Sequence, residues 1–202
     1  MVVGHRATNY IVALSLVFCL TGCIRPAQFD SPLTPPQAAS PLAWRVYMPF
    51  VATGEPSADA TCFSNDKATQ FYQLLRDDAR QQRTQLVCNP ALVKAATKRA
   101  VGLATVDPWS HVDAAGIWPN TYARDAGCRL PTWYGTGNNI ESLMAGSGDA
   151  DEAFASLARS PSHSRHIFGE TDFFREQVSI GIGYAEGGVY GFYWVILTAV
   201  CG

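Results

Sequence analysis

Three segments decide the fold of this chain: Ser110-His111-Val112-Asp113, Gly137-Asn138-Asn139-Ile140-Glu141 and Ser160-Pro161-Ser162-His163. The first and third each carry a histidine, and the middle one leads into an expected strand. Downstream, Gly181-Ile182-Gly183 and the apolar stretch from Tyr193 to Val200 have the composition of strands. Helical and strand patterns therefore alternate around these loops, and an α+β fold is expected.

The spacing of apolar residues predicts the remaining elements. Helices are expected over 65–83, 89–104, 119–124 and 149–159, and strands over 138–145, 178–184 and 190–200. Asn89-Pro90 is typical of a helix start, and Glu186-Gly187-Gly188 is typical of a hairpin turn between the last two strands. These elements predict helices above and below a small antiparallel sheet, an arrangement called a three-layer α-β-α sandwich.

The order of these segments resembles the CAP superfamily (cysteine-rich secretory proteins, antigen 5 and pathogenesis-related protein 1), in its bacterial SCP-like branch. The resemblance covers about residues 88 to 202. Ser110-His111 resembles the segment that carries the family's first pocket histidine. Ser160-Pro161-Ser162-His163 resembles the Ser-Pro-Gly-His motif that carries the second. The resemblance implies the same α-β-α sandwich, with a pocket around the two histidines.

The expected pocket departs from the family in its acidic residues. The family usually has glutamate where Asn138 stands, and animal members have a second glutamate where the nearest matching residue is Ser160. The resemblance therefore implies a pocket of His111, His163, Asn138 and Ser160, with Asp113 beside the first histidine.

Two other glutamates, Glu141 and Glu152, are candidates to replace the missing carboxylates. Glu141 lies three residues along the expected strand from Asn138, and strand side chains alternate between faces, so it should point away. Glu152 follows Asp149 by three residues, a spacing that makes it a capping partner at a helix start.

The residues of the expected pocket predict neither tight metal binding nor efficient catalysis. Two imidazoles and an amide make a poor zinc site, so we expect no resident cofactor and at most weak zinc binding by His111 and His163. His166 could add a third nitrogen on the same helix face, or it could be a surface histidine beside Arg165. Gly-x-Ser-x-Gly is absent from the sequence.

Aromatic residues are frequent around the same segments. They are Trp109, Trp118, Trp133 and Tyr134. Aromatic faces in a cleft suit sugar rings or lipid chains, although burial in the core explains any one of them equally well. Pro108 and Pro131 place Trp109 and Trp133 on loops, where partial exposure is expected.

Four cysteines fall in the expected domain: Cys62, Cys88, Cys128 and Cys201. An even number in an exported chain suggests two disulfides, for which three connectivities exist. Cys62–Cys88 and Cys128–Cys201 are favoured, because the first would clamp both ends of the first helix and the second would hold the end of the last strand. Each would contribute roughly 3–4.5 kcal/mol.

The N-terminal part predicts export. The apolar run from Ile11 to Leu20 followed by Leu20-Thr21-Gly22-Cys23 resembles a bacterial lipobox, in which Cys23 carries the lipid. An ordinary secretory signal or an uncleaved anchor helix are the alternatives. We therefore expect a lipoprotein signal peptide over 1–22, a Pro-rich tether over 23–61 and one domain over 62–202.

Composition limits the partners. The formal net charge is −2, with 15 Lys and Arg against 17 Asp and Glu. A mildly acidic chain without a basic run is not expected to bind nucleic acid. The expected location is the cell envelope, lipid-anchored to a bacterial membrane.

Three functions fit this sequence. The first is a surface-displayed domain that binds a lipid, glycan or protein in a two-histidine cleft and performs no chemistry. The second is a hydrolase acting on peptide or cell-wall material, with His111 or His163 as general base. The third is a purely structural envelope protein. The missing carboxylates favour binding over catalysis.

Overall fold

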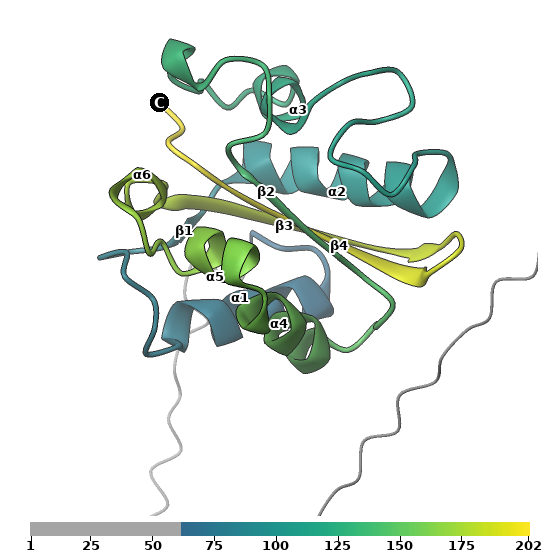
Figure 1. Cartoon of the computed structure of the whole chain (residues 1–202), viewed down its shortest axis with the longest axis horizontal. Helices are drawn as coiled ribbons and strands as arrows, with labels where there is room; N and C mark the ends of the chain where they lie inside the picture. Colours follow the sequence, from purple (N-terminus) through teal and green to yellow (C-terminus); the bar gives the residue numbers. More distant parts are fainter. Residues whose placement is uncertain (1–61) are drawn as a thin grey trace, which may run out of the picture. The chain divides into compact units, whose positions relative to one another are not determined.

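The computed structural model describes residues 62–202 (Figure 1). The expected signal peptide, the lipidation residue Cys23 and the Pro-rich tether lie outside the described residues. Among the residues that are described, no helix has the length and apolar character needed to cross a membrane.

The main helices begin where the sequence places their caps. Asn89 accepts hydrogen bonds from the backbone of Ala91 and Leu92 at the start of α2 (Pro90–Thr105), and Asp149 caps α4 (Ala150–Arg159). Helix α1 (Asp66–Asp77) is capped by Asn65 but ends well before residue 83. It stops because Asp78 is extended and its carboxylate accepts a hydrogen bond from the backbone of Arg80.

The shorter helical elements connect the segments around the sheet. They are α3 (Pro119–Asp125), η2 (Thr132–Tyr134), α5 (Pro161–Ile167) and α6 (Asp172–Arg175). Helix α3 was expected from its opening proline. Helix α5 begins at Pro161, within the Ser160-Pro161-Ser162-His163 segment.

The sheet has four strands in the order β1-β3-β4-β2. They are β1 (Val87–Cys88), β2 (Glu141–Ala145), β3 (Ser179–Gly187) and β4 (Gly191–Ala199). Strands β3 and β4 form the expected hairpin, and β2 pairs antiparallel with β4. The short β1 was not expected, and it pairs parallel with β3, so the sheet is mixed.

Two hydrophobic cores lie on opposite faces of this sheet. One joins buried residues of α2 and α3 to β2 and β4, and the other joins α1, α4 and α5 to β3 and β4. Figure 1 shows α2 and α3 on one side of the strands and α1, α4 and α5 on the other. The α+β sandwich of three layers is therefore confirmed.

Helix α2 packs very closely on β3. A Cβ added at Gly181 would overlap the backbone of Leu92, and one added at Gly183 would overlap the backbone of Ala96. The small residues of α2 and these glycines together allow the helix to approach the sheet, and this contact fixes the loop that follows α2.

Two disulfides join the cysteine pairs that the sequence favoured. Cys62–Cys88 ties the chain before α1 to β1, and Cys128–Cys201 ties the end of the chain to the loop after α3. Both bridges lie at the ends of elements, where they limit fraying.

Candidate functional site

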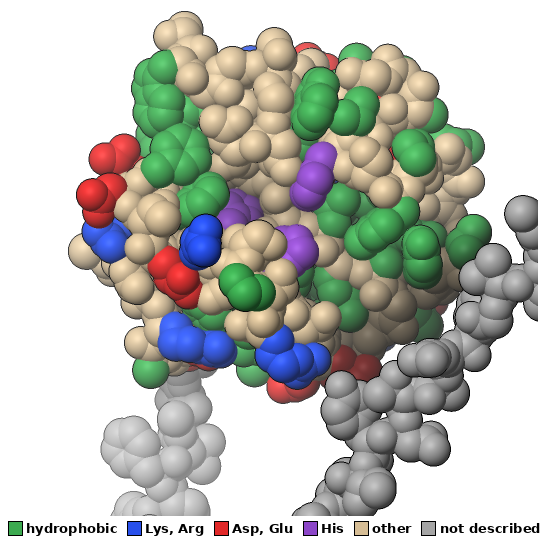
Figure 2. All heavy atoms as spheres, in the orientation of Figure 1, with side chains coloured by type: hydrophobic (Ala, Val, Ile, Leu, Met, Phe, Trp, Pro, Cys, Tyr) green, Lys and Arg blue, Asp and Glu red, His purple; other side chains and the backbone are tan. Residues whose placement is uncertain are grey.

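His111 and His163 lie at the same cavity, which has a volume of about 200 Å³. His111 belongs to the loop after α2, and His163 belongs to α5 in the opposite layer. The start of β2 lies between them, and Asn138, Glu141, Ser142 and His166 also line the cavity. Figure 2 shows the histidine side chains gathered on one face of the domain.

Glu141 is the main difference from the sequence prediction. Its Oε1 lies 2.8 Å from Nδ1 of His111, so this carboxylate faces the pocket and does not point away. The side chain of Glu141 is fully buried, whereas that of His111 is 40% exposed. A carboxylate therefore does hold the first pocket histidine, although it comes from another position than the family's glutamate.

Glu141 was expected to point away because the strand was predicted to start at residue 138. Strand β2 begins at Glu141, and Asn138 lies in a turn in which its Oδ1 accepts hydrogen bonds from the backbone of Ile140 and Glu141. The alternation of side chains applies only within a strand, so the three-residue offset from Asn138 carries no information about direction.

Arg99 extends this pair into a buried network that the sequence analysis missed. Its Nη1 donates to Asp107 at 2.8 Å, its Nη2 donates to the carbonyl of Ser110, and its Nε lies 3.6 Å from Oε2 of Glu141. Arg99 interrupts the apolar face of α2 between Ala96 and Ala100, and that interruption was the available signal.

The electrostatics of the network are governed by burial. Burial raises the pKa of Glu141, and the hydrogen bond from His111 and the charge of Arg99 oppose that rise. Nε of Arg99 and Oε2 of Glu141 have no hydrogen-bond partner among the described residues. When Glu141 is ionised, its Oε1 accepts a hydrogen bond from the Nδ1–H of His111, which leaves Nε2 as the free acceptor of the neutral ring.

His163 is held by a hydroxyl instead. Its Nδ1 lies 2.9 Å from Oγ of Ser160. Burial, followed by the nearby charge of His111, lowers the pKa of His163. Ser160 thus contacts the pocket histidine as expected, but it is not among the residues that line the cavity.

Asp113 is also absent from the cavity lining. Its carboxylate accepts hydrogen bonds from the Tyr122 hydroxyl and from the backbone of Ala115 and Ile117. It therefore shapes the loop after His111, because short acidic side chains readily satisfy nearby backbone donors.

His166 is buried, so the interpretation as a surface histidine is wrong. Its Nδ1 lies 2.7 Å from the hydroxyl of Ser142 and its Nε2 lies 2.8 Å from that of Thr198. The hydroxyl of Thr198 donates a hydrogen bond to Gln177, so it accepts the hydrogen bond from Nε2 of His166. Burial, reinforced by the charge of Arg83, lowers the pKa of His166 to about 3, and the ring is neutral.

Zinc does not fit this donor set well. His166 has both ring nitrogens bonded to hydroxyls, and Oε1 of Glu141 is engaged with His111. No group of three or more metal-ligating side chains with suitable geometry exists within residues 62–202. The cavity therefore offers two imidazoles, which is fewer ligands than zinc normally takes.

The cavity also lacks an activated nucleophile among the described residues. Ser142 is buried and paired with His166, while the hydroxyl of Ser162 lies 3.3 Å from that of Ser160. Neither serine is hydrogen-bonded to His111.

Glu152 forms only half of the capping pair that its spacing predicted, because Ser147 and not Glu152 accepts the hydrogen bond from the backbone N–H of Asp149. Its backbone N–H donates to Asp149 at the start of α4, and its carboxylate accepts from the hydroxyl of Ser147. It does not line the histidine cavity.

The aromatic residues divide between the surface and the core. Trp109, Trp118 and Trp133 are exposed, as the loop prolines suggested for two of them, whereas Tyr134 is buried. None of the four lines the histidine cavity, so they do not form walls of that site.

Comparison with known proteins supports the fold. No family model and no curated protein matches the chain. An extracellular protein of Bacillus anthracis that contains an SCP domain has a similar structure, with a TM-score of 0.51 and 14% identity over 67% of this chain. This chain covers 41% of that protein's length. An outer surface protein of Borrelia burgdorferi gives a TM-score of 0.45 at 16% identity, covering 73% of this chain and 96% of the other.

The layered architecture and the likeness to the Bacillus protein define the class. The described residues have an SCP-like fold, with a four-stranded sheet between two layers of helices. The histidine cavity lies at the β2 edge of the sheet, between the two helical layers.

Proposed function

We propose that this chain is an exported, envelope-displayed SCP-like domain that binds a ligand in the cleft of His111 and His163. One observation carries this proposal: imidazoles from opposite layers line one cavity, and neither has an Nε2 partner within residues 62–202. Two free ring nitrogens in a half-enclosed polar cavity suit a hydrogen-bonding ligand.

We further propose that a lipid on Cys23 anchors the domain to a bacterial membrane. The support is the apolar run ending in Leu20-Thr21-Gly22-Cys23. Each buried CH₂ of an acyl chain contributes about 0.8 kcal/mol, so two or more chains hold a protein durably. Expression of the full chain and of a Cys23→Ala variant tests this: the first should sediment with membranes and the second should not. Equal membrane recovery of both would contradict lipid anchoring.

A second function gains support from the pair of Glu141 and His111. A buried carboxylate that orients an imidazole is the arrangement of a general base, so hydrolysis of peptide or cell-wall material by an activated water is the alternative. The carboxylate whose absence favoured binding in the sequence is therefore present at Glu141. The proposal of binding now rests on the imidazoles of His111 and His163 at one cavity, whose Nε2 atoms have no partner among residues 62–202.

One pair of proteins separates the two functions. The wild type and the His111→Ala, His163→Ala double variant are compared in hydrolysis of peptides and of cell-wall material. The double variant is also compared with the wild type for lipids and glycans that co-purify from envelope extract. Binding predicts a co-purifying ligand lost in the variant, with no turnover. Turnover above background that the double substitution abolishes would establish the hydrolase instead.

A further inference from the structure

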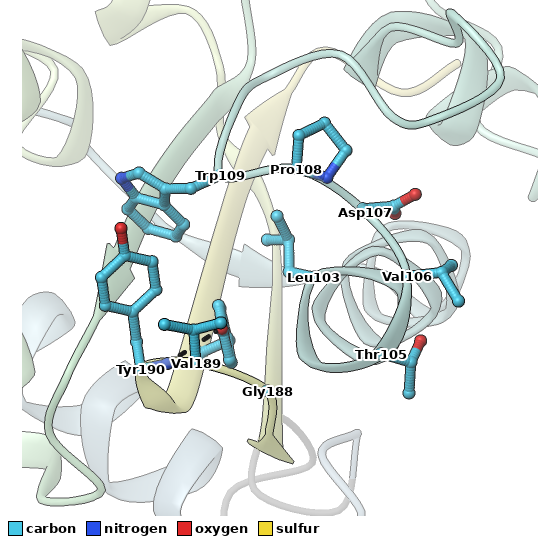
Figure 3. A pocket seen from close by; sticks show the side chains of 10 residues that line it. Leu103, Thr105, Val106, Asp107, Pro108, Trp109, Gly188, Val189 and Tyr190 are labelled. Carbon is cyan, nitrogen blue, oxygen red and sulfur yellow. Dashed lines mark hydrogen bonds between the residues drawn. The ribbon is translucent and has the colours of Figure 1, made fainter.

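A second hollow lies between the end of α2 and the turn of the β3–β4 hairpin, with a volume of about 280 Å³. Figure 3 shows Trp109 and Tyr190 on one side of this groove, Thr105 and Val106 at the end of α2 on the other, and Leu103 between them. It shares no lining residue with the histidine cavity. The groove is thus a separate site.

The aromatic side of the groove is rigid and accessible. The rings of Trp109 and Tyr190 are 44% and 49% exposed, and their centroids are 5.6 Å apart. The buried ring of Tyr193 lies behind both, and its hydroxyl accepts a hydrogen bond from the backbone of Tyr190. Exposed aromatic faces held in this way can cover the C–H face of a ring-shaped ligand.

Free hydrogen-bonding groups surround these rings. The indole N–H of Trp109 and the hydroxyl of Tyr190 have no partner among residues 62–202. The last turn of α2, whose Leu103 and Thr105 line the groove, has carbonyls without a helical partner, because the N–H groups of Val106 and Asp107 both bond to Gly102 and Pro108 has none. Donors and acceptors without partners among the described residues thus lie beside the groove.

No free charge is presented to a ligand. Asp107 is the charged residue in the lining, and its carboxylate is 6% exposed. Its Oδ2 pairs with Arg99 at 2.8 Å and its Oδ1 accepts from the backbone of Ala114. In Figure 3 this carboxylate points away from the aromatic rings. A neutral ligand suits such a surface better than an anion or a cation.

We propose that this groove binds a neutral sugar residue of a glycan. A pyranose ring has an apolar C–H face for Trp109 and Tyr190, and its hydroxyls supply partners for the helix-end carbonyls and the free donors. An acyl chain would cover the same rings but leave those polar groups unpaired, at a cost in free energy. A volume near the lower limit of small-molecule sites suits one or two rings.

The test measures binding of triacetylchitotriose, cellotriose and maltotriose to the full chain by calorimetry and tryptophan fluorescence. Saturable binding of at least one sugar is expected. Trp109→Ala and Tyr190→Ala should each weaken it by about tenfold, because each removes an aromatic face. Trp109→Phe keeps a ring but loses the N–H, and should weaken binding less than Trp109→Ala.

Trp133→Ala is the matched control, because Trp133 is 62% exposed but lies on η2 outside the groove. It should leave sugar affinity unchanged. Thermal unfolding verifies that each variant is folded. Absence of saturable binding to all three sugars would overturn the proposal. Equal losses in Trp109→Ala and Trp133→Ala, or saturable binding of phosphatidylcholine vesicles in place of sugars, would also do so.

Discussion

Glu141 and His111 form the central pair of the histidine cavity, with the Oε1 carboxylate oxygen 2.8 Å from Nδ1. The carboxylate is buried behind the half-exposed ring, and Arg99 lies on its other side. The acidic partner of His111 is thus the first residue of β2.

Removal of the Glu141 carboxylate should be strongly destabilising. Glu141→Ala would leave Arg99 buried with Asp107 as its remaining carboxylate partner, and breaking a buried ion pair costs about 3–5 kcal/mol. Urea unfolding measures this loss. Glu152→Ala is the control, because Glu152 is exposed and its side chain bonds to Ser147, so a loss below about 1 kcal/mol is expected. Similar small losses in both variants would show that the network contributes little to stability.

Stability should fall as the pH falls from 6.5 towards 3 because of His166. Its pKa is about 3 in the folded protein, against 6.5 for a histidine in the unfolded chain, so the unfolded chain binds more protons in this window. Protonation of the unfolded state therefore removes stability, by up to about 4 kcal/mol. The raised pKa of Glu141 acts in the opposite direction, because folding then favours the protonated carboxyl.

A comparison with His166→Gln isolates that effect. The variant should be less stable than the wild type at pH 7, because glutamine cannot reproduce both hydrogen bonds to Ser142 and Thr198. Its free energy of unfolding should nevertheless depend less steeply on pH between 6.5 and 4. Denaturant unfolding at several pH values gives both slopes, and identical slopes would contradict a neutral, buried His166.

The close contact of α2 with β3 predicts a large cost for very small substitutions. In Gly181→Ala or Gly183→Ala the new methyl group would overlap the backbone of α2, and the helix would have to move. Losses of about 3 kcal/mol or more are expected in thermal or urea unfolding. Gly137→Ala is the matched control, because a Cβ there meets no atom within 4 Å. Equal behaviour of all three variants would show that the helix does not lie as close to the sheet.

The two disulfides should differ in their contributions. Cys128–Cys201 spans 73 residues and Cys62–Cys88 spans 26. Loop entropy predicts about 4.4 kcal/mol for the longer loop and about 3.5 kcal/mol for the shorter. Pairwise Cys→Ala substitution and urea unfolding measure each loss. A larger loss for the shorter loop would mean that native-state contacts outweigh chain entropy.

Zinc should bind weakly if at all. Calorimetry with the wild type should give no affinity tighter than micromolar, because the accessible ligands are His111 and His163, while the side chain of Glu141 is fully buried and already bonded to His111. His163→Ala serves as the control, and it should abolish whatever weak signal the wild type gives. A nanomolar site in the wild type would mean that the free oxygen of Glu141 joins the two imidazoles as a ligand.

Local signals in the sequence determined where the elements begin and what kind they are. Asn89-Pro90 and Asp149 predicted the starts of α2 and α4, because a cap bonds to its own helix within three residues. The apolar runs predicted the β3–β4 hairpin for the same local reason. The family resemblance added the two histidines and the layered fold that brings them together.

Only the tertiary structure decided which side chains of the site contact one another. Glu141 faces His111 because a turn at Asn138 delays the start of β2, and Arg99 and His166 are polar residues whose partners lie far away in the sequence. The groove beside Trp109 likewise depends on the hairpin turn meeting the end of α2. Such contacts join distant segments, and no local propensity encodes them, because they exist only once the helices have packed on the sheet.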